Sequence, residues 1–266
     1  SFNIGVSLMD QNEYEEAKHY VQTAHDYYLK VNSEEDLPLS YLGVGIVDTW
    51  TNKSIDKVME SLDKGEALAL KNGDTLLLSN ILNSKAVAFL KNKVNYPTAI
   101  SGLKKAIKLV KIKQPDNHFN LGYSYVFLSK AYWKTKAYEK ALSYNDSSLM
   151  HYTAYNYPKG LKLVYENRKD ILESLGKYKE SVEAHNLFNY YSDSIFKKER
   201  VNQIVRLKTK YETDQIITQK ETAEAKLELT ETISQQNKNY FIGALIISFL
   251  ILMTSIFSRE INAELP

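Results

Sequence analysis

Residues 135–141 read TKAYEKA, and this short stretch decides how the chain folds. Thr135-Lys136 is a turn signal, and the quartet Tyr138-Glu-Lys-Ala141 places a large apolar residue three positions before a small one. Because helix positions three apart lie on one face, the large side chain can plug the turn while the small one lets a second helix approach. The stretch therefore predicts a helical hairpin, that is, two antiparallel helices joined by a short turn.

The same pattern recurs along the chain at nearly equal spacing. Successive quartets end 41, 41, 42 and 40 residues apart, and each follows a short turn signal. Longer joints with Pro, Gly or Asn separate the hairpins. Since one hairpin cannot bury its apolar face alone, five of them are expected to stack into an all-α, right-handed solenoid with a concave face. The five quartets are Tyr14-Glu-Glu-Ala17, Ile55-Asp-Lys-Val58, Tyr96-Pro-Thr-Ala99, Tyr138-Glu-Lys-Ala141 and Tyr178-Lys-Glu-Ser181.

This arrangement resembles the tetratricopeptide repeat family over roughly residues 2–195. The family repeat is about 34 residues long, so a period of about 41 residues implies helices that are each about one turn longer. HEAT and armadillo repeats have a period near 41 and remain the alternative, although Tyr-x-x-Ala is not their turn signature. The packing positions of the family are matched best in the first and fourth units, by Gly5, Leu8, Tyr14, Ala17 and Ala24, and by Leu128, Ser129, Tyr132, Tyr138 and Ala141.

Residues 240–257 read YFIGALIISFLILMTSIF and contain no charged side chain. At about 1.5 Å of rise per residue, such a helix is close to the roughly 30 Å thickness of the hydrocarbon core of a bilayer. The alternative, a buried core helix of a soluble domain, normally keeps a polar stripe, and this stretch has none. Lys238, Tyr240 and Arg259 are placed to reach the membrane interfaces. One transmembrane helix is therefore expected from Tyr240 to Phe257.

Between the repeats and the apolar stretch, nothing obliges a helix to stop. Residues 177–242 contain neither glycine nor proline, so a long helix is expected from about Ser192. Its apolar residues make a loose heptad pattern, compatible with a single solvated helix or with the stalk of a homodimer. The expected domains are a repeat solenoid over 1–191, a juxtamembrane helix or coiled-coil stalk over 192–239, the transmembrane helix over 240–257, and a short tail over 258–266 that is either the true end or a cut one.

Composition and motifs exclude several classes of function. The net charge of +2, from 34 basic and 32 acidic residues, gives no reason to expect a nucleic acid partner. The chain has no cysteine, so disulfides and thiolate metal sites are excluded. We find no phosphate-binding glycine loop, no Gly-x-Ser-x-Gly motif and no metal-binding His spacing, so neither an enzyme nor a cofactor is expected from these residues. The five histidines are interpreted as ordinary surface or packing residues.

The concave face, formed by the first helix of each hairpin, is the best candidate for a functional surface. It is predicted to be aromatic and basic in the middle and acidic at its C-terminal end, and Trp and Tyr are residues that anchor protein partners. The alternative is that these are packing aromatics on an ordinary charged surface. The candidate binding residues are Trp50, Lys91, Asn92, Tyr123, Lys130, Trp133, Lys134, Glu166 and Asp170, with Val47 and Glu173 beside them.

The order of segments suggests a role in signalling. Repeats, the stretch Lys210-Tyr-Glu-Thr-Asp214, a charged helix and one membrane span together resemble the sensor half of a large Bacteroidetes family. That resemblance implies periplasmic repeats on a single-pass protein of the bacterial inner membrane, followed by a histidine kinase or a LuxR-type DNA-binding domain. The sequence predicts a sensor that binds a protein, peptide or small ligand; the alternative is a tail-anchored cytoplasmic scaffold.

Overall fold

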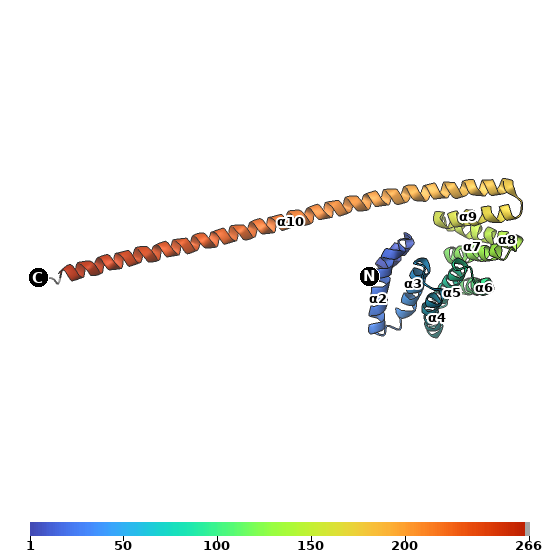
Figure 1. The fold of residues 1–266 in the computed structure, drawn as a ribbon, viewed down its shortest axis with the longest axis horizontal. Helices are drawn as coiled ribbons and strands as arrows, with labels where there is room; N and C mark the ends of the chain where they lie inside the picture. The colour runs from blue at the N-terminus through green and yellow to red at the C-terminus, as the bar shows by residue number, and fades with distance from the viewer. Residues whose placement is uncertain (264–266) are drawn as a thin grey trace. The chain divides into compact units, whose positions relative to one another are not determined.

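The computed structural model describes the backbone of residues 1–263 and the side chains of residues 1–255. The last residues of the predicted tail, 264–266, therefore lie outside the described part. The described chain is 87% helix without strands. Its helices are α1 (Phe2–Asp10), α2 (Tyr14–Lys30), α3 (Leu37–Trp50), α4 (Ile55–Lys71), α5 (Thr75–Lys91), α6 (Tyr96–Lys113), α7 (His118–Lys134), α8 (Tyr138–Ala154), α9 (Pro158–Ser174) and α10 (Tyr178–Ala263), as Figure 1 shows.

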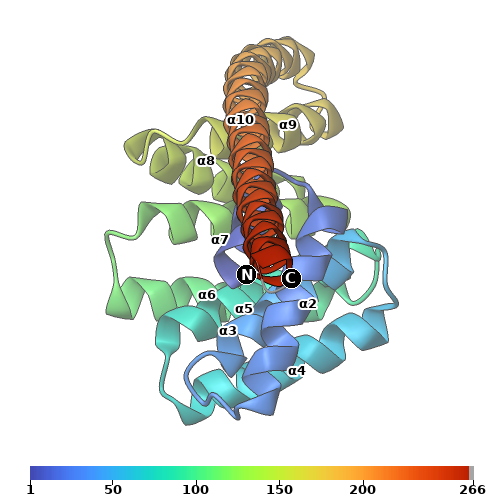
Figure 2. The ribbon, with the colours of Figure 1, turned by 90° about the vertical axis from the view of Figure 1, so that its left-hand side faces the viewer.

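The five quartets mark the second helices of five hairpins. The first residue of each quartet is the first residue of α2, α4, α6, α8 or α10. The last residue is buried in the first four hairpins, with Ala17, Val58 and Ala141 at 0% exposure and Ala99 at 1%. Successive hairpins then stack, from the blue α2 to the yellow α9 in Figure 2. The predicted all-α, tetratricopeptide-like solenoid is confirmed.

The short turns share one hydrogen-bond pattern. In each, a backbone N–H just after the first helix donates to the carbonyl five residues earlier, for example Ala137 to Tyr132 at 2.9 Å and Lys177 to Leu172 at 2.8 Å. This bond satisfies a carbonyl that the helix end would otherwise leave without a partner. It requires a left-handed residue in the turn, such as Lys136 at φ 61° or Gly176 at φ 71°. The turn signals are therefore helix C-caps.

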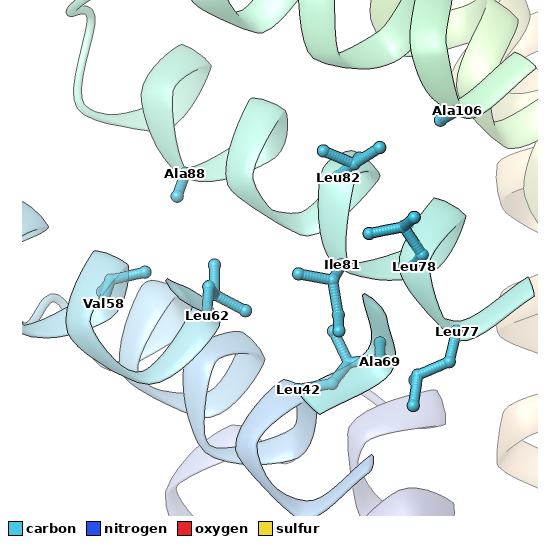
Figure 3. Packing of buried hydrophobic residues seen from close by; sticks show 10 residues of the cluster. All are labelled: Leu42, Val58, Leu62, Ala69, Leu77, Leu78, Ile81, Leu82, Ala88 and Ala106. Atoms are coloured by element: carbon cyan, nitrogen blue, oxygen red, sulfur yellow. The ribbon is translucent and has the colours of Figure 1, made fainter. Parts of the chain in front are cut away.

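Four hydrophobic clusters bridge successive hairpins. The cluster in Figure 3 joins the second and third hairpins, with Leu62 of α4 and Ile81 of α5 at 0% exposure. Ideal burial of one such side chain stabilises the fold by about 1.5–3 kcal/mol. Because each cluster involves neighbouring hairpins, stability is built from nearest-neighbour interfaces.

The fifth hairpin, which ends the stack, has a polar residue at one position that the earlier hairpins bury, and it also exposes Tyr178, Val182 and Tyr190. The position four residues after the end of a quartet is covered by the next hairpin. The residues there in the second, third and fourth hairpins are each 0% exposed: Leu62, Leu103 and Asn145. The equivalent residue of the fifth hairpin is His185, which is exposed. A polar outer face is what a terminal repeat of a solenoid needs for solubility.

The chain consists of two units, within each of which the residues contact one another. We call them the solenoid (Ser1–Lys197) and the extension, which begins at Lys198. α10 belongs to both: it is a single helix from the fifth hairpin onward. The long helix expected from about Ser192 is thus the continuation of a repeat helix that starts at Tyr178. The described part of the chain contains one stretch long and apolar enough to cross a membrane, and none of its window is buried.

Candidate functional site

The first helices of the hairpins line the inner side of the solenoid. α3 packs on α5, α5 on α7 and α7 on α9, whereas the second helices α2, α4, α6 and α8 do not pack on one another. The side with closer helices is the concave one. Side chains of α3, α5, α7 and α9 that point away from the clusters therefore share one surface.

Five of the nine candidate residues meet in one cleft between α7 and α9. The cleft has a volume of about 230 Å³. Its apolar floor is formed by Val126, Phe127 and Leu163. The predicted residues that line it are Lys130, Trp133 and Lys134 of α7, and Glu166 and Asp170 of α9.

Trp133 is fixed as one wall of this cleft. Its indole Nε1 donates a hydrogen bond to Ser174 Oγ at 3.0 Å, which ties the end of α7 to the end of α9. Lys134 Nζ lies 4.3 Å from the centroid of the Trp133 ring, within cation–π range. Because the indole N–H already has a hydrogen-bond partner, the exposed part of the Trp133 ring can pack against an apolar side chain of a ligand.

The charges of the cleft are arranged by helix. α7 contributes Lys130 and Lys134, whereas α9 contributes Glu166 and Asp170 together with Lys169. Asp170 is partly neutralised because its Oδ1 lies 3.2 Å from Lys169 Nζ. The cleft can thus bind an apolar side chain flanked by a negative group toward α7 and a positive group toward α9.

A second cluster forms at the ends of α3 and α5. The Trp50 ring stacks on Tyr14, with centroids 5.3 Å apart and planes 14° apart. Lys91 Nζ lies 4.6 Å from the Trp50 centroid and donates to the Thr49 carbonyl at 2.8 Å. Burial lowers the pKa of Lys91. The structure brings the predicted pair Trp50 and Lys91 together, and adds Tyr14.

The remaining predicted residues have different surroundings. Tyr123 packs against Phe127 with ring centroids 4.7 Å apart. Burial raises the pKa of the Tyr123 phenol well above its ordinary value, and the nearby phenols of Tyr14 and Tyr157 add to the rise. The Asn92 amide caps its own helix by donating to the Ala88 carbonyl at 2.9 Å.

One residue named beside the candidates is misplaced. Val47 was expected on the concave face but is 2% exposed and packs in the hydrophobic cluster that joins the first and second hairpins. The α2–α3 interface covers this part of α3, because the first hairpin lies against it.

Sequence reasoning missed two contacts between distant residues. Lys159 Nζ, at the start of α9, donates to the carbonyl of Asp10 at 2.8 Å, so the first hairpin reaches the fifth. His118 and His151 were interpreted separately, but their Nδ1 atoms lie 2.9 Å apart. The contact of Lys159 depends on how the hairpins rotate as they stack. His118 and His151 belong to α7 and α8 of one hairpin, so their contact depends on how these two helices pack. No group of three or more metal-ligating side chains occurs among the described residues.

A larger hollow of about 500 Å³ lies at the joint between α6 and α7, lined by Gln114 to Asn120 and Tyr155. It is shallow and made mostly of loop residues. We therefore take the α7–α9 cleft, whose walls are two packed helices, as the candidate site.

The fold belongs to the tetratricopeptide-like class of helical repeats, as comparison with solved structures shows. The chain is similar to the nearly identical TPR-like repeats of a Podosopora anserina protein assigned as a kinesin light chain, with a TM-score of 0.54 and 13% identity over 73% of this chain and 94% of that chain. A single-substitution variant of the same protein gives a TM-score of 0.55 and 13% identity over 74% of this chain and 94% of that one. No family model and no curated protein matches the sequence.

Proposed function

We propose that this chain is a membrane-anchored interaction module that binds a protein or peptide on the concave face of its solenoid. The observation that carries the proposal is the convergence of five predicted residues on the α7–α9 cleft. Its apolar floor and fixed Trp133 ring suit one anchoring side chain. The α7 wall carries two lysines and the α9 wall two carboxylates and one lysine. This difference in charge would set the direction of a bound segment.

Peptide selection on the full chain in lipid nanodiscs tests the concave site. Peptides enriched from a display library should contain one apolar residue between an acidic and a basic one. Their affinity for the Trp133→Ala variant should be about tenfold or more below that for the unchanged chain, since a central aromatic anchor contributes about 2 kcal/mol or more. The matched control Lys179→Glu changes an exposed charge of α10 and should bind normally. Enriched peptides that bind Trp133→Ala as well as the unchanged chain would refute the site.

Membrane anchoring rests on the apolar part of α10. Its side chains are exposed, with Phe241 at 66% and Leu252 at 57%, so the helix by itself gives them no apolar environment. A bilayer would supply it. We further propose the topology implied by the Bacteroidetes resemblance, with periplasmic repeats and a signalling domain on the other side of the membrane.

The cysteine-free chain makes this topology easy to measure. Cysteines introduced as Glu35→Cys and Ser258→Cys can be labelled on intact cells with a membrane-impermeant thiol reagent. Labelling at position 35 alone supports an outward-facing sensor. Labelling at position 258 alone places the repeats inside and favours the second candidate, a tail-anchored cytoplasmic scaffold. Recovery of both variants in the soluble fraction would exclude a membrane anchor.

A homodimer would explain the surface of the extension. Apolar residues of its helix are exposed, among them Ile204 at 61%, Leu207 at 68% and Tyr211 at 64%. A long helix that is solvated all round gains no tertiary stabilisation, whereas pairing with a second copy would bury these side chains. Ligand binding could then shift the equilibrium between two dimer arrangements, provided that its affinity for the two differs. Disulfide cross-linking of Tyr211→Cys within intact membranes tests the pairing, with Glu212→Cys as its neighbour control.

A further inference from the structure

The even charge balance of the whole chain conceals an uneven distribution between hairpins. Residues 75–115, which contain the third hairpin, include eight lysines and no acidic residue. Residues 1–36, which contain the first hairpin, include eight acidic residues and only two lysines. Such segregation creates a strong local potential even though the net charge of the chain is small.

The lysines of α6 form a stripe. Lys104, Lys108 and Lys111 follow the spacing i, i+4, i+7 and so lie on one face of the helix, and all three are exposed. Lys105 and Lys113 are exposed beside them. At about 1.5 Å per residue, the three lysines of the stripe span about 10 Å along the helix axis.

These charges are held in place but are weakly neutralised. Lys104 Nζ lies 5.6 Å from the Tyr132 ring, and Lys111 Nζ lies 5.6 Å from the Tyr125 ring. Glu66 lies 4.0 Å from Lys105 and is already paired with Lys85. Among the described residues, Lys108 has no carboxylate partner. The stripe therefore keeps its positive potential.

The lysine stripe is narrow and has acidic side chains on a neighbouring helix, which limits the kind of partner that can bind it. On α4, which flanks α6, the side chains of Glu60 and Asp63 are each 64% exposed. A flat anionic bilayer broad enough to extend from α6 over α4 would meet these carboxylates, and like charges repel. A narrow acidic segment, one helix wide, can follow the stripe without meeting them.

We propose that the outer face of α6 is a second interaction surface, which binds an acidic helical segment of a partner protein. Acidic residues at i, i+4 and i+7 of an antiparallel partner helix match the spacing of Lys104, Lys108 and Lys111. Exposed ion pairs are individually weak, so the surface gives association rate and orientation more than affinity. This proposal does not depend on ligand binding at the concave cleft.

The test uses the full chain in nanodiscs of neutral lipid and two synthetic helical peptides of identical composition. One peptide carries Glu at i, i+4 and i+7; in its isomer the same Glu residues are spread around the helix. The striped peptide should bind about fivefold or more tightly than the isomer, and the difference should shrink at high salt because screening weakens exposed pairs. Equal binding of the two peptides, or binding of neither, would overturn the proposal.

Charge-reversal variants locate the surface. The triple variant Lys104→Glu, Lys108→Glu and Lys111→Glu should lower the affinity for the striped peptide about tenfold. This estimate assumes the loss of three exposed ion pairs of ordinary strength. The control with Lys177→Glu, Lys179→Glu and Lys197→Glu makes the same change in net charge at exposed positions of the fifth hairpin and should change affinity less than about twofold. Equal losses in both would show that only net charge matters.

A milder variant and two other polyanions complete the test. The triple Lys→Gln variant of the stripe removes the charges without reversing them and should also lose binding, which guards against misfolding of the charge-reversed chain. Anionic vesicles and duplex DNA serve as competing probes. If either binds through the stripe while the striped peptide does not, the partner is a bilayer or a nucleic acid, and the proposal is wrong.

Discussion

Replacing Gly160 by alanine should destabilise the solenoid, because the ring of Tyr152 occupies the space that the new methyl group needs. A Cβ at Gly160 would lie 2.7 Å from both Cδ1 and Cδ2 of Tyr152 and 2.6 Å from Cδ1 of Tyr157. Tyr152 is 0% exposed, and Gly122 closes its other side, where a Cβ would lie 2.8 Å from the same ring. The ring therefore has no free space on either side.

The size of the effect follows from the cost of overpacking. Inserting one methyl group into a filled core usually costs about 1–3 kcal/mol. For a domain of about this size, each kcal/mol lowers Tm by about 2–4 °C, so a drop of about 2–12 °C is expected. The control is Gly102→Ala, whose Cβ would meet only the Leu82 carbonyl at 3.7 Å, an ordinary contact. That change should stabilise the helix by about 0.5–1 kcal/mol.

Denaturant unfolding monitored by Trp fluorescence measures both variants, since Trp133 lies in α7 beside the affected interface. A double-mutant cycle then assigns the cause. Tyr152→Leu alone should cost about 2 kcal/mol or more, because it leaves a cavity. In the Tyr152→Leu background, Gly160→Ala should lose at least about 1 kcal/mol of its penalty, as expected for residues in contact. Strictly additive effects, or a stable Gly160→Ala single variant, would refute the packing account.

Three other changes have definite expected outcomes. Lys136 is left-handed, with φ 61°, so Lys136→Gly should raise the free energy of unfolding by about 0.5–1 kcal/mol in denaturant titrations, and a loss would show that its side chain matters more than its backbone. The pKa of His151 is lowered by burial and by the nearby His118 and Lys111, so this side chain binds a proton more readily in the unfolded state than in the folded state. The free energy of unfolding should therefore fall as pH drops through about 6.5. His151→Gln should flatten this pH dependence. Lys85 joins α5 to Asp63 and Glu66 of α4 with a side chain only 15% exposed; Lys85→Ala should cost about 1–3 kcal/mol by thermal unfolding, and an unchanged Tm would show that the ion pairs are dispensable.

The helical hairpins could be predicted because their signals are local. Tyr138 is the first residue of α8, as its quartet indicates, and Ala141 is fully buried. Turn chemistry, the large residue and the small residue all act within about ten positions along the chain. The same logic identified the α7–α9 residues Trp133 and Asp170, because equivalent positions of successive repeats share a surface.

Contacts across several hairpins could not be predicted in the same way. The bond between Lys159 and Asp10 depends on the small rotation that each hairpin adds to the last. Periodicity specifies which face of a helix is buried, but not the superhelical twist. Val47 shows the remaining ambiguity, since the repeat pattern placed it on the concave face, whereas it is buried against the first hairpin.

The uninterrupted helix of the extension fixes the rotation about the helix axis between the start of the extension and its apolar stretch. The helix runs from Tyr178 to Ala263, and between Gly176 and Gly243 the chain has no glycine and no proline. An α-helix turns by about 100° per residue, so one residue inserted between 198 and 239 would rotate everything after it by about 100° relative to the helix before it, whereas seven would restore the original facing to within about 20°. The number of residues in the extension, more than their chemical identity, thus determines which side of the apolar stretch is aligned with a given face of the helix at the start of the extension.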